Sequence, residues 1–437
     1  VKNMVLWIGL ILNIVLIIYS VYKTIKSKNI LSPQMFLAIS ILLYIYMPAV
    51  VLKSKYIEDE GYNFVLLVGV LGIFVVNKIF PYNMLLDHLD DKKEYEPIIS
   101  VCQIGAYIYV AYLFLGIIQA IISAGGIMEV FKVNRLQSFL GGGMLSESSV
   151  SMIITEGLKI LFYLYFAILF YKRKKIQALL LYVIPMINHR FTAVTRYDFV
   201  AMAGALVVFL IDEKLYYQST DKEKTVEKKR INLLKIGIIG LCVTYFALIF
   251  MRLANDTRFG VSSSEIDFSV SSLLKTTVSN DSLYYEYFHS LYTGVKDGLV
   301  SYEYGLSWFI YPFMNLIPRS VWPEKPYTAF SARMTNELFW NLDSGNPVVT
   351  FSILGEGYAQ LGLLGVFISP LIFMMSRWMN FKLLRKMRYS NVYILITMFS
   401  LLTYMRSEAP IFLALIDQLW LIVICFSFSY RRRKQKL

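Results

Sequence analysis

Arg190 and Arg196 lie in the stretch NHRFTAVTRYDF, residues 188–199, between two short apolar runs. Because those runs are shorter than a usual membrane crossing, we expect the turn between them to be sunk below the membrane surface. An arginine held there needs an anionic partner, and its guanidinium fork matches phosphate oxygens in a bidentate manner. The alternative is that both arginines reach lipid headgroups or pair with Asp198.

A second arginine lies in the motif NLIPRSVWPEKP, residues 315–326. The prolines of this motif prevent a continuous helix and fix an irregular backbone. Such a backbone suits a binding loop, since it displays four side chains in set directions: Arg319, Trp322, Glu324 and Lys325. The alternative is a solvent-exposed turn whose charges have no function.

Glu356 stands in the run SILGEGYAQLGLLG, residues 352–365, where a late span is expected to enter the bilayer from outside. Flanking glycines allow another backbone or a substrate to approach closely. A partly desolvated carboxylate beside arginines is suited to act as a general base for a hydroxyl group. The helix macrodipole also favours a carboxylate near a helix N-terminus, so a structural cap remains open as the alternative.

Aromatic residues crowd the segment from Tyr284 to Tyr311, and Arg252 and Arg258 precede it. Aromatic rings stack on sugar rings, but they also populate the membrane interface and ordinary cores. Composition alone does not separate these roles.

The composition is that of an all-α polytopic membrane protein. Of the 437 residues, 57% are hydrophobic and 17% are charged, and the mean hydropathy is +0.55. We expect one integral membrane domain over residues 1–437 with about 11 transmembrane helices, because that many apolar runs approach the ~20 residues that a crossing needs. The expected spans are 4–22, 33–52, 62–80, 98–123, 152–171, 176–188, 198–212, 231–251, 353–376, 391–405 and 410–429.

Basic residues predict the orientation of these spans. The formal net charge is +13, and most Lys and Arg residues cluster against alternate span ends. The positive-inside rule then places the N-terminus outside and the C-terminus in the cytoplasm. Residues 252–350 become a large extracytoplasmic loop. We expect no nucleic-acid partner, because no soluble domain exists to present a basic face.

Metal and nucleotide chemistry have no recognisable motif in the sequence. Cys102, Cys242 and Cys425 fall in or at the ends of spans and the histidines are dispersed, so no metal-type spacing occurs. No P-loop or dinucleotide-binding glycine motif is present. We therefore expect no cofactor and no metal, and we expect any activated donor to arrive attached to lipid.

The motifs TAVTRYDF, IPRSVWPEKP and GEGYAQLG follow one another in the chain. This combination resembles the oligosaccharide repeat unit polymerases, the Wzy-type polymerases of O-antigen and capsule assembly. The likeness in span layout covers nearly the whole chain, and the specific matches lie between about 186 and 365. Family members often have glycine after the first arginine, where this chain has Tyr197.

The resemblance implies a metal-independent glycosyltransferase of GT-C architecture. In that family a growing polysaccharide on undecaprenyl pyrophosphate is transferred to the next lipid-linked repeat unit, on the outer face of the bacterial cytoplasmic membrane. The partners so implied are the lipid-linked oligosaccharide, the growing polysaccharide, membrane lipids and a chain-length regulator protein.

The resemblance and the residues together give a hypothesis for the site. As an acceptor hydroxyl attacks the anomeric carbon, fixed arginines stabilise the charge that grows on the departing pyrophosphate. Glu356 deprotonates or orients the acceptor, with His189 in reserve, and a single displacement inverts the anomeric centre. The pyrophosphate-binding candidates are Arg196, Arg319, Arg190, Arg252 and Arg258, and the sugar-contacting candidates are Trp322 and Tyr358.

Three other functions stay open. A ligase that moves a finished glycan from the same lipid uses identical chemistry. A lipid-phosphate sugar transferase needs metal-binding acids in an early outer loop, where Glu58, Asp59 and Glu60 are the candidates. A flippase or other transporter usually shows two related halves, and the sequence shows none.

Ionisable residues inside the expected spans predict internal pairs. Glu156 and Lys159 lie three residues apart on one helix face, so we expect a mutual ion pair. Asp417 in the last span is expected to pair with another helix.

Overall fold

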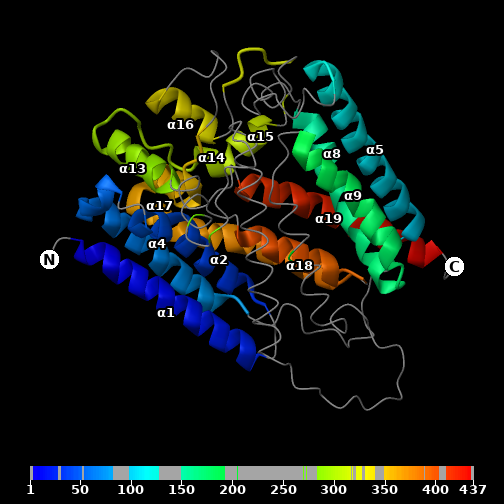
Figure 1. Ribbon diagram of the computed structural model, residues 1–437, viewed down its shortest axis with the longest axis horizontal. Coiled ribbons are helices and arrows are strands. Elements are labelled where there is room, and N and C mark those ends of the chain that lie inside the picture. Colours follow the sequence, from blue (N-terminus) through cyan, green and yellow to red (C-terminus); the bar gives the residue numbers. More distant parts are fainter. Residues whose placement is uncertain are drawn as a thin grey trace.

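The computed structural model describes residues 3–27, 31–51, 54–81, 98–126, 149–191, 204, 269, 272, 283–315, 317, 321–326, 330–339, 349–387, 389–402 and 410–434. Helices form the regular structure of these residues (Figure 1). The longer helices are α1 (Met4–Lys26), α2 (Pro33–Ile41), α4 (Glu60–Ile79), α5 (Ile99–Ala124), α8 (Ser149–Tyr171), α9 (Lys175–Phe191), α13 (Leu283–Lys296), α16 (Phe330–Leu338), α17 (Ser352–Arg385), α18 (Asn391–Ser400) and α19 (Pro410–Lys434). The shorter helices are η1 (Leu42–Tyr46), α3 (Met47–Val51), η2 (Lys55–Glu58), α14 (Leu306–Phe309) and α15 (Tyr311–Asn315).

Six helical stretches are long and apolar enough to cross a membrane. They are Met4–Lys26, Pro33–Val51, Glu60–Ile79, Ile99–Gln119, Ile153–Tyr171 and Ser352–Arg385. The predicted all-α, multi-pass character is therefore confirmed. The total of about 11 spans, the GT-C arrangement and the orientation stay predictions. The predicted span 198–212, apart from Gly204, and the predicted span 231–251 lie outside the described residues.

The helices pack as two groups joined through the C-terminal helices. In the first group, α4 packs against α1, α2 and α17. In the second, α5, α8 and α9 lie side by side at the right of Figure 1. Helix α8 also contacts α18 and α19, and α19 packs on α17, so the two groups form a continuous bundle.

Polar side chains inside the bundle are paired between helices. Ser20 of α1 donates a 2.7 Å hydrogen bond to Asn77 of α4, and Thr24 donates one of 2.8 Å to Ser32. Ser32 also caps α2 by accepting the Met35 amide. Such hydrogen bonds hold apolar helices together where the hydrophobic effect gives no preference for helix contact over lipid contact.

Two predicted ion pairs are confirmed. Lys159 lies 3.5 Å from Glu156 on α8, and Arg377 of α17 lies 2.8 Å from Asp417 of α19. The sequence placed Arg377 in a cytoplasmic loop, but the helix continues through it. Its positive charge therefore compensates the carboxylate of the neighbouring helix.

Helix α17 is broken near its N-terminal end, which the sequence did not predict. Leu361 and Gly362 have non-helical backbone angles, and Gly362 has a φ of 60°. The two helical parts, 352–360 and 363–385, fold against each other and come closest at two glycines. A Cβ added to Gly365 would lie 1.8 Å from the carbonyl oxygen of Gly357. Only glycine allows this backbone contact. The second part alone approaches the ~20 residues needed to cross a bilayer.

The segment between α9 and α17 contributes a layer of helices over the end of the bundle. Helices α13, α14, α15 and α16 lie together in the upper part of Figure 1, and α13 packs on α17. The predicted loop 252–350 is thus partly helical. Tyr285, Phe288 and Trp308 from its aromatic run are buried, whereas Tyr304 is 77% exposed.

Candidate functional site

Glu303 stands at the centre of a buried polar cluster formed where α14 and α16 meet α17. One carboxylate oxygen accepts a 2.9 Å hydrogen bond from Arg333 Nε. The other accepts a 2.9 Å bond from an Arg333 terminal nitrogen, a 2.5 Å bond from Gln360 Nε2 and a bond from the Ser307 hydroxyl. The side chains of Arg333 and Glu303 are 9% and 10% exposed. We call Glu303, Ser307, Arg333 and Gln360 the Glu303 cluster.

Gln360 joins this cluster to the broken helix. Its Oε1 accepts the Gly305 amide at 2.9 Å. The backbone amides of Glu303 and Tyr304 donate to the carbonyls of Ala359 and Gln360, at 2.9 and 3.0 Å. These bonds satisfy carbonyls that the break in α17 leaves without helical partners. The break and the cluster therefore depend on each other.

Arg333 reaches the cluster from α16. Its guanidinium lies over the Tyr311 ring, 3.8 Å from the centroid, and a terminal nitrogen donates a 2.5 Å hydrogen bond to the Ser307 hydroxyl. A planar guanidinium can make bidentate and stacking contacts at once, which lysine cannot. Arg333 thus ties α14, α15 and α16 into one unit.

Glu356 lies one helical turn before Gln360 in the short part of α17. It is 4% exposed, and Glu303 and Arg333 are the charged groups that act on it. Among the described residues no hydrogen bond to its carboxylate is found, although a buried polar group usually has one. The capping alternative has no hydrogen bond to support it, since no side chain caps α17 and Glu356 lies beyond the first turn. Glu356 is therefore a buried carboxylate with its hydrogen-bonding capacity unused.

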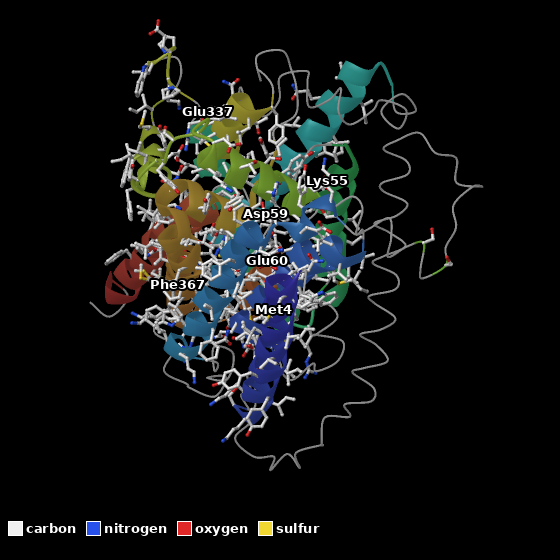
Figure 2. All side chains as sticks on the ribbon, turned by 90° about the vertical axis from the view of Figure 1, so that its left-hand side faces the viewer. Met4, Lys55, Asp59, Glu60, Glu337 and Phe367 are labelled. Carbon is white, nitrogen blue, oxygen red and sulfur yellow. The ribbon has the colours of Figure 1, made fainter. Side chains whose placement is uncertain are left out.

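Glu337 is a third carboxylate near Arg333, one turn further along α16. It is exposed at the upper edge of the face in Figure 2. Partial burial and the charge of Glu303 raise its pKa, and Arg333 acts in the opposite direction. Two glutamates, one buried and one exposed, thus flank the Glu303–Arg333 pair.

Asp59 makes a second polar contact, with a histidine of α13. Its carboxylate caps α4 by accepting the Tyr62 amide at 3.0 Å and lies 3.0 Å from His289 Nε2 of α13. Tyr56 stacks on the imidazole with ring centroids 4.0 Å apart. Figure 2 shows Asp59 beside Glu60 at the start of α4, with Lys55 nearby. The segment that precedes α4 is therefore bound to α13.

The Asp59–His289 contact perturbs both groups. Burial acts to raise the pKa of Asp59, but the Tyr62 amide and His289 outweigh it, so this pKa is lowered. Burial lowers the pKa of His289, and the bond and charge of Asp59 offset this only in part. A neutral imidazole that donates to the carboxylate is therefore the favoured state.

The two sugar-contacting candidates lie in different surroundings. Tyr358 is 7% exposed and packs among Phe288, Tyr292 and Tyr302, with ring centroids 5.5–6.3 Å away. Trp322 is 38% exposed in the proline-rich turn, where neighbouring Lys325 is buried and donates to the Ile317 carbonyl at 2.7 Å. Trp322 has a free surface for a ligand, whereas Tyr358 is largely covered by other rings.

The predicted arginines fall mostly outside the described residues. His189 and Arg190 lie in the last turn of α9, which extends past the predicted span, but their side chains are not among those described. The remaining arginine candidates lie outside the described residues altogether: Arg196, Arg252, Arg258 and Arg319. Their proposed contacts with pyrophosphate stay predictions.

Sequence reasoning missed Glu303, Arg333 and Gln360. The aromatic run drew attention to the rings around Glu303 and not to Glu303 itself. Arg333 lies in the short amphipathic stretch FSARMTNEL, with no motif around it. The one available signal was that both charges lie in the same predicted outer segment.

Metal chemistry finds no support in the described part of the chain, where no three His, Cys, Asp or Glu side chains come together as a metal site requires. Comparison with known proteins gave no match to a family description, to a curated protein or to a solved structure.

Proposed function

We propose that the chain polymerises oligosaccharide units carried on a lipid pyrophosphate, at the outer face of a bacterial cytoplasmic membrane. The observation that carries the proposal is Glu356, a buried carboxylate without a hydrogen bond among the described residues, beside the Glu303–Arg333 pair. The resemblance of its motif to the Wzy-type polymerases supplies the substrate class. The multi-pass helical architecture supports a lipid-borne substrate.

In the proposed reaction, Glu356 takes the proton of an acceptor sugar hydroxyl. The hydroxyl oxygen forms a bond to the anomeric carbon of the donor, and the bond from that carbon to pyrophosphate breaks. The electron pair leaves with the lipid pyrophosphate. No metal or nucleotide takes part in this balance.

Arg333 has a supporting role in this proposal. Its guanidinium is already bound to Glu303 and stacked on Tyr311. The departing pyrophosphate would instead be held by Arg196 and Arg319, with Arg190, Arg252 and Arg258 as further candidates. Arg333 fixes the position of Glu303. The negative charge of Glu303 in turn influences the ionisation of Glu356.

The test is polymerisation by the purified protein in lipid vesicles supplied with one synthetic undecaprenyl-pyrophosphate repeat unit. We expect a ladder of products on a gel, and loss of about 10²–10⁴-fold in rate for Glu356→Gln, the range typical of a general base. Asp297→Asn, at an exposed acid just beyond the end of α13, is the control and should retain activity.

Each alternative gives a different result in the same assay. Single transfer to another molecule indicates a ligase, and movement of the lipid-linked unit across the vesicle without a new bond indicates a transporter. Full polymerisation by Glu356→Gln would remove this carboxylate from the mechanism. Arg196→Ala and Arg319→Ala test the pyrophosphate contacts in the same way.

A further inference from the structure

A cavity of about 570 Å³ lies between α5, α8 and α9, in the helix group opposite α1 in Figure 1. It opens at the turn that joins α8 to α9, where Lys172 and Lys174 line its rim and are exposed. The positive-inside prediction assigns this end of the helices to the cytoplasm. We call it the lysine-rimmed cavity. It shares no residue with the Glu303 cluster.

The lining combines basic residues at the ends of the helices with polar and apolar residues beyond them. Gln177 lies two residues after the start of α9 and Gln103 four residues after the start of α5, roughly 3 and 6 Å along the helix axes at 1.5 Å per residue. The apolar part of the wall is formed by Ile99, Val110, Ile168, Leu169, Leu180 and Leu181. A phosphate at the lysines would bring a glycerol ester to the level of the glutamines and an acyl chain against the apolar residues further in, Val110, Leu180 and Leu181.

Two tyrosines mark the polar middle of the cavity. Gln103 Nε2 donates a 3.3 Å hydrogen bond to the Tyr107 hydroxyl, and the Tyr107 and Tyr165 rings meet edge to face at 6.0 Å. Polar groups within a span usually face the protein interior or a ligand and not lipid tails. Here they line open space, where ester oxygens can accept their hydrogen bonds.

We infer that the lysine-rimmed cavity binds one anionic glycerophospholipid of the adjoining leaflet. The phosphate lies against Lys172 and Lys174, the glycerol region against Gln103 and Gln177, and one acyl chain along the apolar wall. Basic pockets between membrane helices are suited to such headgroups, whereas a free phosphate would leave the apolar wall without a partner. The inference does not depend on the proposed polymerase function.

Native mass spectrometry of the detergent-purified chain tests this inference. The probes are phosphatidylglycerol and phosphatidylcholine with the same acyl chains. We expect one retained phosphatidylglycerol per chain, bound about tenfold or more tightly than phosphatidylcholine, since each lysine near an anionic headgroup contributes substantially. Equal retention of the two lipids would overturn the inference.

Two variants locate the site. Lys172→Gln combined with Lys174→Gln should remove the preference for phosphatidylglycerol, whereas Lys382→Gln should keep it. Lys382 is a matched control because it is exposed near the end of α17 and lies over Trp378 instead of the cavity. Unchanged preference in the double variant would refute the assignment.

Leu181→Trp fills the apolar wall and should reduce retention of both lipids. A thermal unfolding scan in lipid-free detergent shows whether each variant is folded, and phosphatidylglycerol should raise the unfolding temperature of the parent chain and not of the lysine double variant. If millimolar inorganic phosphate raised the unfolding temperature as much as phosphatidylglycerol does, the cavity would be a phosphate site and the lipid assignment would be wrong.

Discussion

The Glu303 cluster and the lysine-rimmed cavity are both polar regions of an apolar bundle, but their side chains are satisfied differently. Glu303 receives hydrogen bonds from Arg333, Ser307 and Gln360 and has little exposed surface. Lys172 and Lys174 are exposed and border open space. A saturated cluster holds segments of the chain together, whereas an unsaturated rim is available to a ligand. Stability should therefore depend on the first region and lipid binding on the second.

The largest loss of stability is expected from Gly365→Ala. This substitution disrupts the helix break that supports the Glu303 cluster. A Cβ there would lie 1.8 Å from a backbone oxygen, so the two parts of α17 must separate. We expect a loss of at least about 3 kcal/mol in the free energy of unfolding, beyond usual overpacking. A thiol-reactive dye can follow unfolding, because the side chains of Cys102 and Cys425 are buried in the folded chain.

Gly355→Ala is the control for that substitution. Its added Cβ meets only side-chain atoms of Phe351, Leu291 and Phe288, at 3.1–3.3 Å, which can adjust. We expect a modest fall in the unfolding temperature. An equal fall in unfolding temperature for the two variants would show that the contact between Gly357 and Gly365 is not especially important for stability.

Breaking the Glu303–Arg333 pair should have the next largest effect. Removing one partner leaves the other charge buried, so Glu303→Gln and Arg333→Gln should each cost about 3 kcal/mol. The double variant should cost less than the sum, which a double-mutant cycle on thermal unfolding measures. Lys172→Gln, in the lysine-rimmed cavity, should leave lipid-free stability unchanged. Additive costs at Glu303 and Arg333 would mean that the two side chains act independently.

The difference between the two regions also separates what sequence can predict from what it cannot. Apolar length is a local property, so the predicted span 62–80 nearly coincides with α4 (Glu60–Ile79). Asp417 was expected to have a partner, because a charge inside a span needs a compensating group. That partner is Arg377, which lies just beyond the predicted span 353–376.

The Glu303 cluster depends on contacts that no local pattern encodes. Glu303 meets Arg333 across 30 residues and Gln360 across 57. The break at Leu361 and Gly362 was hidden within a continuous apolar run, although the glycines of that run had indicated a close backbone approach. Glu356 was found by sequence because it stands alone within an apolar span. Arg333 was not, because charges are common in an outer segment.

The smallest effect is expected from titration of His289. It tests whether the contact of His289 with Asp59 contributes to the free energy of unfolding. The folded state lowers the pKa of His289 below the ordinary value of 6.5, so the unfolded chain binds a proton first as pH falls. Stability should be fully present above about pH 6.5 and should decline below it, until the folded imidazole also protonates.

Asp59 does not account for the same pH window. Its pKa is lowered from 3.8, so the stability it contributes is lost only at more acidic pH. The other charged groups beside this contact are Lys55 and Glu286, which face His289, and Lys296, which faces Asp59. Unfolding temperatures at pH 7.5 and 5.5 should therefore differ in the parent chain and differ less in His289→Gln. The same decline in both proteins would assign the pH dependence to other titratable groups and would leave the contact with α13 without a measurable role.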